Sequence, residues 1–165
     1  MKKTIKPKKI ILQIILFIGI IFIIRIYQHQ GLAVGKAPLF SSISLTKKHL
    51  KTDLQHTPIL VNFWATWCKI CELEQNNIEN IAKDYLVLNI AIQSGTDAKV
   101  LSYAKKHNLN PKNIINDRTG TLANLYGVKA TPTSFIINKS GDITFKEVGY
   151  TTELGLRFRL WLANL

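Results

Sequence analysis

Residues 59–71 read Ile-Leu-Val-Asn-Phe-Trp-Ala-Thr-Trp-Cys-Lys-Ile-Cys, and this stretch decides the fold. The run 59–65 is short and almost wholly apolar, which predicts a strand buried on both faces. From 68 to 85 the apolar residues recur at helical spacing, which predicts a helix. The chain's two cysteines, Cys68 and Cys71, therefore stand where a buried strand gives way to a helix.

That position supplies a chemical mechanism for a reactive thiol. The first N–H groups of a helix have no partner within it, and the helix dipole is positive at that end, so both favour a thiolate at Cys68. Lys69 adds a neighbouring positive charge. Cys71 lies one turn further along the same side, close enough to form a disulfide. We expect Cys68 to be the exposed attacking thiol and Cys71 the more buried resolving thiol. Electrons would travel through these thiols, so no bound cofactor is expected.

Two cysteines at this spacing can also be half of a zinc site or a pair of structural cysteines. Zinc requires four ligands, and the chain has no second cysteine pair. Its four histidines are not paired at ligand spacing; they are His29, His49, His56 and His107. Structural cysteines are disfavoured because the pair opens a helix after a strand. We therefore favour a redox pair over both alternatives.

Apolar runs and spacings also predict the remaining elements of the domain. Strands are expected at 86–92, 113–116, 133–137 and 143–148, and helices at 97–107, 120–126 and 152–165. Residues 138–142, Asn-Lys-Ser-Gly-Asp, signal a hairpin between the last two strands. In the closing helix, apolar side chains recur at helical spacing, namely Leu154, Phe158, Trp161 and Leu165. This order of elements predicts an α/β fold with a mixed central sheet flanked by helices.

The N-terminal segment predicts a membrane anchor. Residues 10–24 form an apolar run broken only by Gln13. A spanning helix needs about 20 residues, and the run reaches that length if Lys9 and Arg25 extend their charged ends to the membrane surface. We expect a basic tail at 1–9, a transmembrane helix at 10–28, a linker at 29–40 and an α/β domain at 41–165.

The distribution of positive charge around the apolar run predicts that the domain lies outside the cytoplasm. Five lysines precede the apolar run and only Arg25 closely follows it, which predicts a cytoplasmic N-terminus. The domain would then lie on the periplasmic side of the inner membrane, held by a single span. A cleaved signal peptide is the alternative, because Ala33-Val34-Gly35 offers small residues. The distance from Ile24 is long for cleavage, so we favour an uncleaved anchor, and either interpretation exports the domain.

The net charge of +12 does not indicate nucleic-acid binding, because much of it belongs to the N-terminal segment. From residue 37 onward, 15 basic residues face 10 acidic ones, and the basic residues are scattered. No dense basic stripe interleaved with aromatic residues appears, so we expect no nucleic-acid partner.

The segment 61–71 resembles the active-site segment of the thioredoxin superfamily. Within it, the chain is most similar to exported, membrane-anchored thiol–disulfide oxidoreductases related to the cytochrome-c-maturation thioredoxins, above all the suppressor-of-copper-sensitivity D type. Gln93-Ser94-Gly95, Asn116-Asp117 and the tail 148–157 also resemble that group. The resemblance covers roughly residues 38–165. It implies a thioredoxin-like fold and exchange with cysteines of exported proteins.

The resemblance also implies roles for residues outside the cysteine pair. Thr131-Pro132 matches the superfamily's cis-proline, which would let the Thr131 backbone pair with a substrate strand. An ordinary proline at a strand entry is the alternative. Glu74 matches an acidic residue of the cytochrome-c-maturation group, where it could move protons for Cys71. The alternative is a solvated helix carboxylate. Trp67 is expected to form an apolar lip that docks substrates.

Two positions depart from the family pattern. Asn62 occupies the strand position where ordinary thioredoxins carry a buried Asp, so any carboxylate role would pass to Glu74. The helix also lacks the proline that many relatives carry after the second cysteine, because Asn76 or Asn77 stands there.

Family analogy favours a reductase or a role in redox homeostasis. The pair would then be recharged by a membrane-embedded thiol reductase, a partner that only the resemblance implies. A copper(I)-binding module is the alternative function, because thiolates are soft ligands. Met1 is the only methionine, so no methionine-rich ligand set supports it.

Overall fold

The computed structural model describes residues 7–52 and 57–165, which form two separate compact units. The first is helix α1 (Pro7–His29), and within it Lys9–His29 is long and apolar enough to cross a membrane. The predicted anchor at 10–28 lies inside this helix. Of the predicted basic tail at 1–9, residues 1–6 lie outside the described residues, as does His56. The second unit begins at Gly31.

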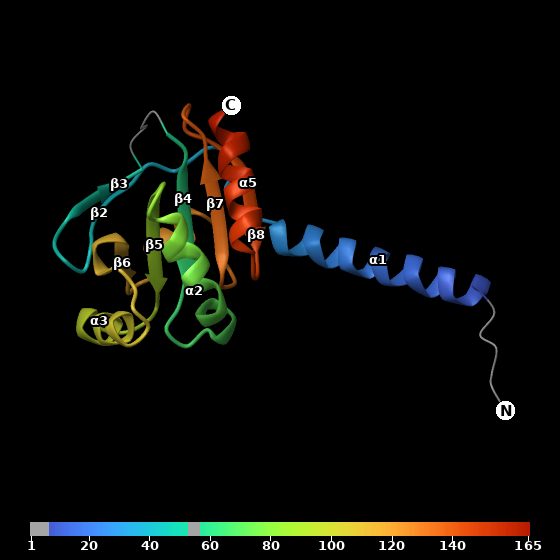
Figure 1. The fold of residues 1–165 in the computed structure, drawn as a ribbon, viewed down its shortest axis with the longest axis horizontal. Helices are drawn as coiled ribbons and strands as arrows, with labels where there is room; N and C mark the ends of the chain where they lie inside the picture. Colours follow the sequence, from blue (N-terminus) through green and yellow to red (C-terminus); the bar gives the residue numbers. More distant parts are fainter. Residues whose placement is uncertain (1–6, 53–56) are drawn as a thin grey trace. The chain divides into compact units, whose positions relative to one another are not determined.

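The domain is built on a six-stranded mixed sheet with the strand order β1-β8-β7-β4-β5-β6 (Figure 1). β4, β5 and β6 are parallel to one another, whereas β7, β8 and β1 extend the sheet with antiparallel pairings. The strands are β1 (Gly35–Lys36), β4 (Ile59–Trp64), β5 (Leu86–Ile92), β6 (Ile114–Asp117), β7 (Thr133–Ile137) and β8 (Asp142–Val148). The mixed sheet predicted from the sequence is confirmed.

Helices α2 (Lys69–Ile81) and α5 (Glu153–Asn164) pack against each other on one face of this sheet (Figure 1). Their inner side chains form a cluster with one residue from each of three neighbouring strands. The cluster contains Ile78, Ile81, Leu156, Leu160, Ala163, Leu60, Val87 and Ile136. Leu60 lies opposite both Val87 and Ile136 in the strand registers, so the three side chains share one face. Burial of this cluster holds α2 against the centre of the sheet.

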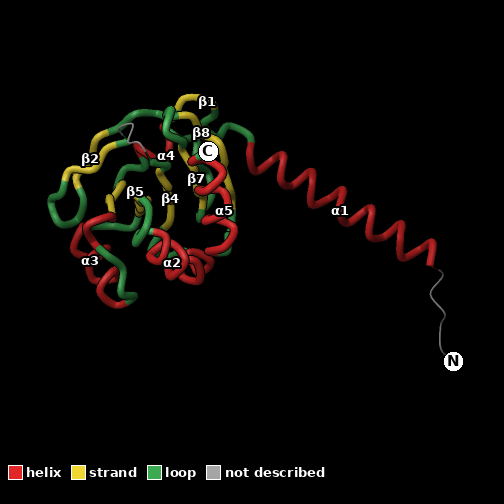
Figure 2. The backbone as a smooth tube through the Cα atoms, turned by 45° about the horizontal axis from the view of Figure 1, so that its top comes forward, coloured by secondary structure: helices red, strands yellow, loops and turns green. Residues whose placement is uncertain are grey.

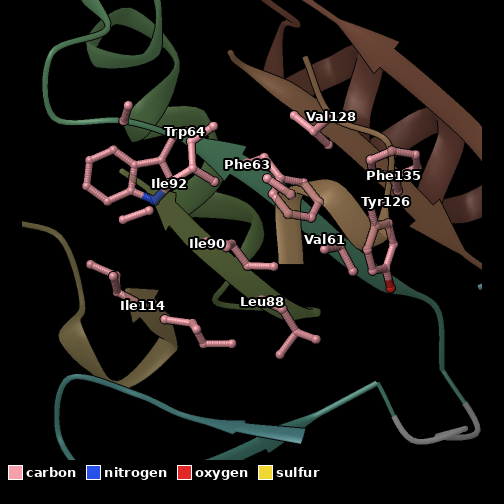
Figure 3. Close-up of a cluster of buried hydrophobic side chains, with 14 of the residues drawn as sticks. Val61, Phe63, Trp64, Leu88, Ile90, Ile92, Ile114, Tyr126, Val128 and Phe135 are labelled. Atoms are coloured by element: carbon pink, nitrogen blue, oxygen red, sulfur yellow. The ribbon is translucent and has the colours of Figure 1, made fainter. Parts of the chain in front are cut away.

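A larger cluster contains the main aromatic contacts of the domain (Figure 3). Phe63, Tyr126 and Phe135 contact one another, with ring centroids 5.1 to 5.9 Å apart. Further apolar side chains come from α3 (Asp97–Lys106) and α4 (Thr121–Leu125), and a short 3-10 helix, η1 (Pro111–Asn113), precedes β6. Because β4 is buried at every position, this central strand packs on both faces, as its apolar sequence predicts.

The segment expected to be a linker, 29–40, differs in the structure, because the domain already begins at Gly31. Leu32 and Ala37 are buried in the core, and the N–H of Ala33 donates to the carbonyl of Tyr126. Figure 2 shows β1 beside β8, to which it is paired. The hairpin of β2 (Ser41–Ile43) and β3 (His49–Lys51) was not predicted either. Its strands have three residues each, too few for a period-2 pattern to be visible.

The closing helix α5 has two apolar faces, and the shorter side chains supply the buried one. Leu156, Leu160 and Ala163 face the core. The four side chains that recur at helical spacing in the sequence are instead exposed, namely Leu154, Phe158, Trp161 and Leu165. Periodicity alone cannot distinguish these faces, because both repeat every three or four residues.

Gly127 and Gly35 provide a test of how tightly the start of the domain is packed. Both have left-handed backbones, with φ of 69° and 70°. A Cβ at Gly127 would collide with the backbone of Gly31, whereas a Cβ at Gly35 meets open space. We expect Gly35→Ala to lower the free energy of unfolding by only the backbone cost, about 1–2 kcal/mol. Gly127→Ala should lower it further, as measured by urea unfolding. Equal losses would show that residues 31–33 do not pack against α4.

Candidate active site

Cys68 is the N-cap of α2, four residues after Trp64, the last residue of β4. Its backbone is extended, with φ −89° and ψ 106°, so the chain enters the helix from outside through this residue. Its Sγ accepts the backbone N–H of Cys71 at 3.1 Å. A sulfur at this point is therefore held by one of the unpaired donors at the helix start, as the sequence predicts.

Cys68 and Cys71 form a disulfide, with their Cα atoms 5.3 Å apart. Both residues are largely covered: Cys68 is 8% exposed and Cys71 is 2% exposed. The expectation that Cys68 is exposed is therefore wrong for this disulfide-bonded form, in which the cis-proline loop lies against its sulfur, although Cys68 is still the less buried of the two. The assignment of these two roles stays a prediction.

The peptide bond between Thr131 and Pro132 is cis, as the resemblance implied. Sγ of Cys68 lies 3.6 Å from the carbonyl oxygen of Thr131, so this loop faces the disulfide directly. Pro132 is buried and Thr131 is partly exposed, just before β7 begins. The cis-proline loop and the start of α2 thus bring together residues more than sixty positions apart.

Glu74 is buried, with 1% of its surface exposed, which excludes the alternative of a solvated helix carboxylate. It lies on α2 three residues after Cys71. Its Oε1 accepts the backbone N–H of Thr151 at 2.7 Å. Burial raises the pKa of Glu74 to about 7, and the Thr151 hydrogen bond opposes part of that rise. A group with this pKa exchanges protons near neutral pH.

Asn77 holds the same segment of chain from the next turn of α2. Its Nδ2 donates to the carbonyl of Thr151 at 3.0 Å. The N–H and C=O of Thr151 are therefore both bound by side chains of α2. This contact gives a structural reason for an asparagine at position 77.

Asn62 is buried and belongs to an uncharged network within the sheet. Its Nδ2 donates to Oδ1 of Asn89 at 2.9 Å, and its Oδ1 accepts the hydroxyl of Ser134 at 3.0 Å. These partners satisfy the amide without an ionised group. Asn62 provides no carboxylate, so Glu74 is the acidic group that can serve Cys71.

Trp67 and Trp64 have different environments. Trp67 is 62% exposed, and its Nε1 donates to the carbonyl of Gln93 at 3.3 Å. It borders a pocket of about 140 Å³ whose lining also includes Gln93 and Thr131. Trp64 is buried in the core and packs against Tyr103, with ring centroids 5.4 Å apart. Only Trp67 is placed to contact a substrate.

Sequence reasoning missed one support of the redox loop, the hydroxyl of Ser94. This buried Oγ accepts the N–H of Thr66 at 3.0 Å and donates to the carbonyl of Ile92 at 3.0 Å. The adjacent Gln93 has a positive φ of 43°, which turns its carbonyl toward Trp67. In the sequence, Gln93-Ser94-Gly95 only matches a family pattern, and no local pattern predicts the hydrogen bond between Ser94 and Thr66.

Among residues 7–52 and 57–165, no group of three or more His, Cys, Asp or Glu side chains is placed to hold a metal ion. The sulfurs of Cys68 and Cys71 are joined as a disulfide, and such a pair can take part in thiol–disulfide exchange.

Comparisons with known proteins agree with this geometry. The model of the AhpC/TSA family matches residues 35–146. A thioredoxin-like protein of Haemophilus influenzae is 34% identical over 111 residues, which are 67% of this chain and 65% of that protein. The thiol–disulfide oxidoreductase ResA of Bacillus thuringiensis is 30% identical over 132 residues, or 76% of each chain.

Solved structures show the same fold. The exposed lipoprotein thioredoxin Etrx1 of Streptococcus pneumoniae superimposes with a TM-score of 0.66 at 25% identity, covering 76% of this chain and 99% of that one. A thiol:disulfide interchange protein of Chlorobium tepidum gives a TM-score of 0.70 at 23% identity, covering 81% and 98%. The chain thus belongs to the AhpC/TSA family, and among its thioredoxin-like members it is a thiol–disulfide oxidoreductase that carries its disulfide between Cys68 and Cys71.

Proposed function

We propose that this chain reduces disulfides in exported proteins from a position on the periplasmic side of the inner membrane, where a membrane thiol reductase recharges it. The observation that carries the proposal is the buried carboxyl of Glu74, one helical turn after Cys71. A reductase must deprotonate its resolving thiol during each cycle, and a carboxyl with a pKa of about 7 is suited to accept that proton at neutral pH.

The reaction proceeds in two exchanges. The Cys68 thiolate attacks one sulfur of a substrate disulfide, which breaks that bond and releases the other substrate sulfur as a thiolate. Cys71 then passes its proton to Glu74 and attacks Sγ of Cys68. This second step releases the substrate's remaining sulfur and leaves the Cys68–Cys71 disulfide. Two electrons pass to the substrate, and the oxidised pair that results is the state of the structure.

Substrate would reach Cys68 along the cis-proline loop. Thr131 is partly exposed, and its carbonyl lies 3.6 Å from Sγ of Cys68, so a substrate strand paired with this backbone would bring its cysteine to the site. The exposed ring of Trp67 would cover the substrate from the other side. Protein cysteines in extended segments are therefore the substrate class.

The location rests on α1 and on the charges around it. A helix long and apolar enough to span a membrane leads directly into the domain. Lysines concentrate on its N-terminal side, which supports a cytoplasmic N-terminus and an exported domain.

Replacement of Glu74 tests its role as proton acceptor. We expect Glu74→Gln to lower kcat/KM for reduction of a protein disulfide by about 100-fold, because an amide cannot accept the proton. The ascending limb of the pH–rate profile near pH 7 should also disappear. Glu79→Gln, on the same helix, is the matched control and should stay within about twofold of the wild type. A loss shared equally by both variants would contradict the role of Glu74.

The raised pKa of Glu74 also predicts how stability depends on pH. The folded protein binds this proton more tightly than the unfolded chain, so stability falls as pH rises from about 4.5 to about 7. The oxidised wild type should lose roughly 3 kcal/mol across this window relative to Glu74→Gln, from a pKa difference of about 2.5. Urea unfolding at several pH values measures the difference. Parallel curves for the two proteins would show that the carboxyl is not destabilised by burial.

The redox state in cells tests direction and location together. A membrane-impermeant maleimide added to intact spheroplasts should label Cys68 in the steady state, because a reductase outside the cytoplasm is kept reduced. Cys71→Ser should accumulate mixed disulfides with exported proteins, and Cys68→Ser should accumulate none. A pair found oxidised in the wild type would reverse the direction. Labelling that requires a permeant reagent would place the domain in the cytoplasm.

A further inference from the structure

The outer face of α5 carries four large apolar side chains that no described residue of the domain covers. Leu154, Phe158, Trp161 and Leu165 are 79%, 56%, 52% and 82% exposed, and we call them the α5 stripe. Their spacing of three or four residues puts them in one row along the helix. The rings of Phe158 and Trp161 stack with centroids 6.0 Å apart.

The α5 stripe is separate from the core of the domain. The opposite side of the helix supplies the core contacts through Leu156, Leu160 and Ala163. Single exposed apolar residues are common on protein surfaces, but a continuous row that includes Trp and Phe marks an interaction site. Helix α5 lies beside α2 on one face of the sheet (Figure 1), and because its core side chains face the sheet, the α5 stripe lies on the side of the helix that points away from it.

The two arginines of α5 lie away from the α5 stripe and are held by ion pairs within the domain. Around a helix of 3.6 residues per turn, Arg157 lies about 70° from the middle of the row and Arg159 about 130° from it. Arg157 donates to Asp84 at 2.7 Å and to Glu153 at 2.8 Å, and Arg159 lies 2.9 Å from Glu147. The surface that the row presents is therefore apolar, and it includes a Trp, the residue type that is enriched where headgroups meet acyl chains.

We infer that the α5 stripe lies in the headgroup region of the bilayer that α1 spans, so that the domain rests on the membrane through α5. The inference rests on the membrane anchoring proposed above. Its occupant is a lipid surface, because a row of Leu, Phe and Trp suits the boundary between headgroups and acyl chains.

The connectivity of the domain puts this surface within reach. β1, whose first residue is Gly35, pairs with β8, and Arg159 of α5 contacts Glu147 of the same strand. The chain from His29, the last residue of α1, to Gly35 spans at most about 20 Å when fully extended. The start of β1 therefore lies within about 20 Å of the end of α1, whatever the orientation of the domain.

The size of the α5 stripe favours a membrane over a second copy of the chain. A stable dimer buries about 800 Å² and about 20–30 residues on each partner, whereas this row comprises four side chains on one helix. A tethered domain meets its own bilayer at a high effective concentration, so a small apolar contact is sufficient.

Contact through α5 would also fix the position of the redox pair. Thr151, just before the helix, accepts from Asn77 and donates to Glu74 of α2, and Asn80 donates to Glu153 at the first turn of α5 at 2.9 Å. Because α5 is bound to the helix that carries the cysteines, its contact with lipid would hold Cys68 at a constant height above the membrane.

Quenching of Trp161 by brominated lipid tests the inference on the full chain in nanodiscs. The variant Trp161→Phe fluoresces only from Trp64 and Trp67. Subtracting its emission from that of the wild type therefore gives the fluorescence of Trp161. We expect lipids brominated near the headgroup to quench at least half of that difference. The double variant Leu154→Ser/Phe158→Ser should lose most of the quenching. Leu39→Ser, which removes a residue that is 74% exposed outside the α5 stripe, should retain it.

Equal Trp161 emission in brominated and ordinary lipid would overturn the inference. A second contrary result would be a Trp161 that neither brominated lipid nor iodide quenches, together with cross-links between copies of the chain. That result would make the α5 stripe a dimer interface. Two measurements on the same samples separate this failure from failure of the proposed function. If the chain could be extracted from the membrane by alkali, α1 would not be an anchor. If reduction of disulfides did not depend on Cys68, the proposed activity would be wrong. If the anchor and the activity both persist without quenching, only the inference about α5 fails.

Discussion

The functional site depends on the junction between a fully buried strand and the first turn of a helix. β4 is covered at every position, so it fixes the point in the domain at which α2 starts. Cys68 occupies the N-cap at that point and its sulfur accepts a helix N–H. The cis-proline loop, Ser94 and Gln93 all make their contacts with this junction. Without a rigid strand behind it, the sulfur would have no fixed relation to any of them.

The same architecture places Glu74, the residue proposed to accept the proton of Cys71. The helix that presents Cys68 also carries this carboxyl into the interior, where burial makes its charged form costly. The single hydrogen bond from Thr151 compensates only in part. Burial of Glu74 therefore lowers stability at neutral pH, where part of the carboxyl is still protonated. Asn62 on the neighbouring strand carries no charge and belongs to an amide and hydroxyl network.

Predictions from the sequence are most accurate where a local pattern has a single physical explanation. The strand at 59–65, the helix after it, the disulfide and the cis peptide before Pro132 are all confirmed. Contacts between distant segments could not be predicted, because nothing local encodes them. Ser94, which follows β5, accepts a hydrogen bond from Thr66, which follows β4. Leu32 is buried although its neighbours have the composition of a linker. The two apolar faces of α5 look equivalent in the sequence, and only the packed domain shows which is exposed.

The reactivity of the reduced Cys68 thiol tests the central claim most directly. Its alkylation rate can be followed against pH in Cys71→Ser, where no internal disulfide forms. A thiolate stabilised by the start of α2 should reach its half-maximal rate well below the value of about 8.5 for an ordinary cysteine. It should therefore react faster at neutral pH than cysteine in an unfolded peptide. A half-maximal rate at about 8.5 or above would contradict the claim that the helix N-terminus activates this sulfur.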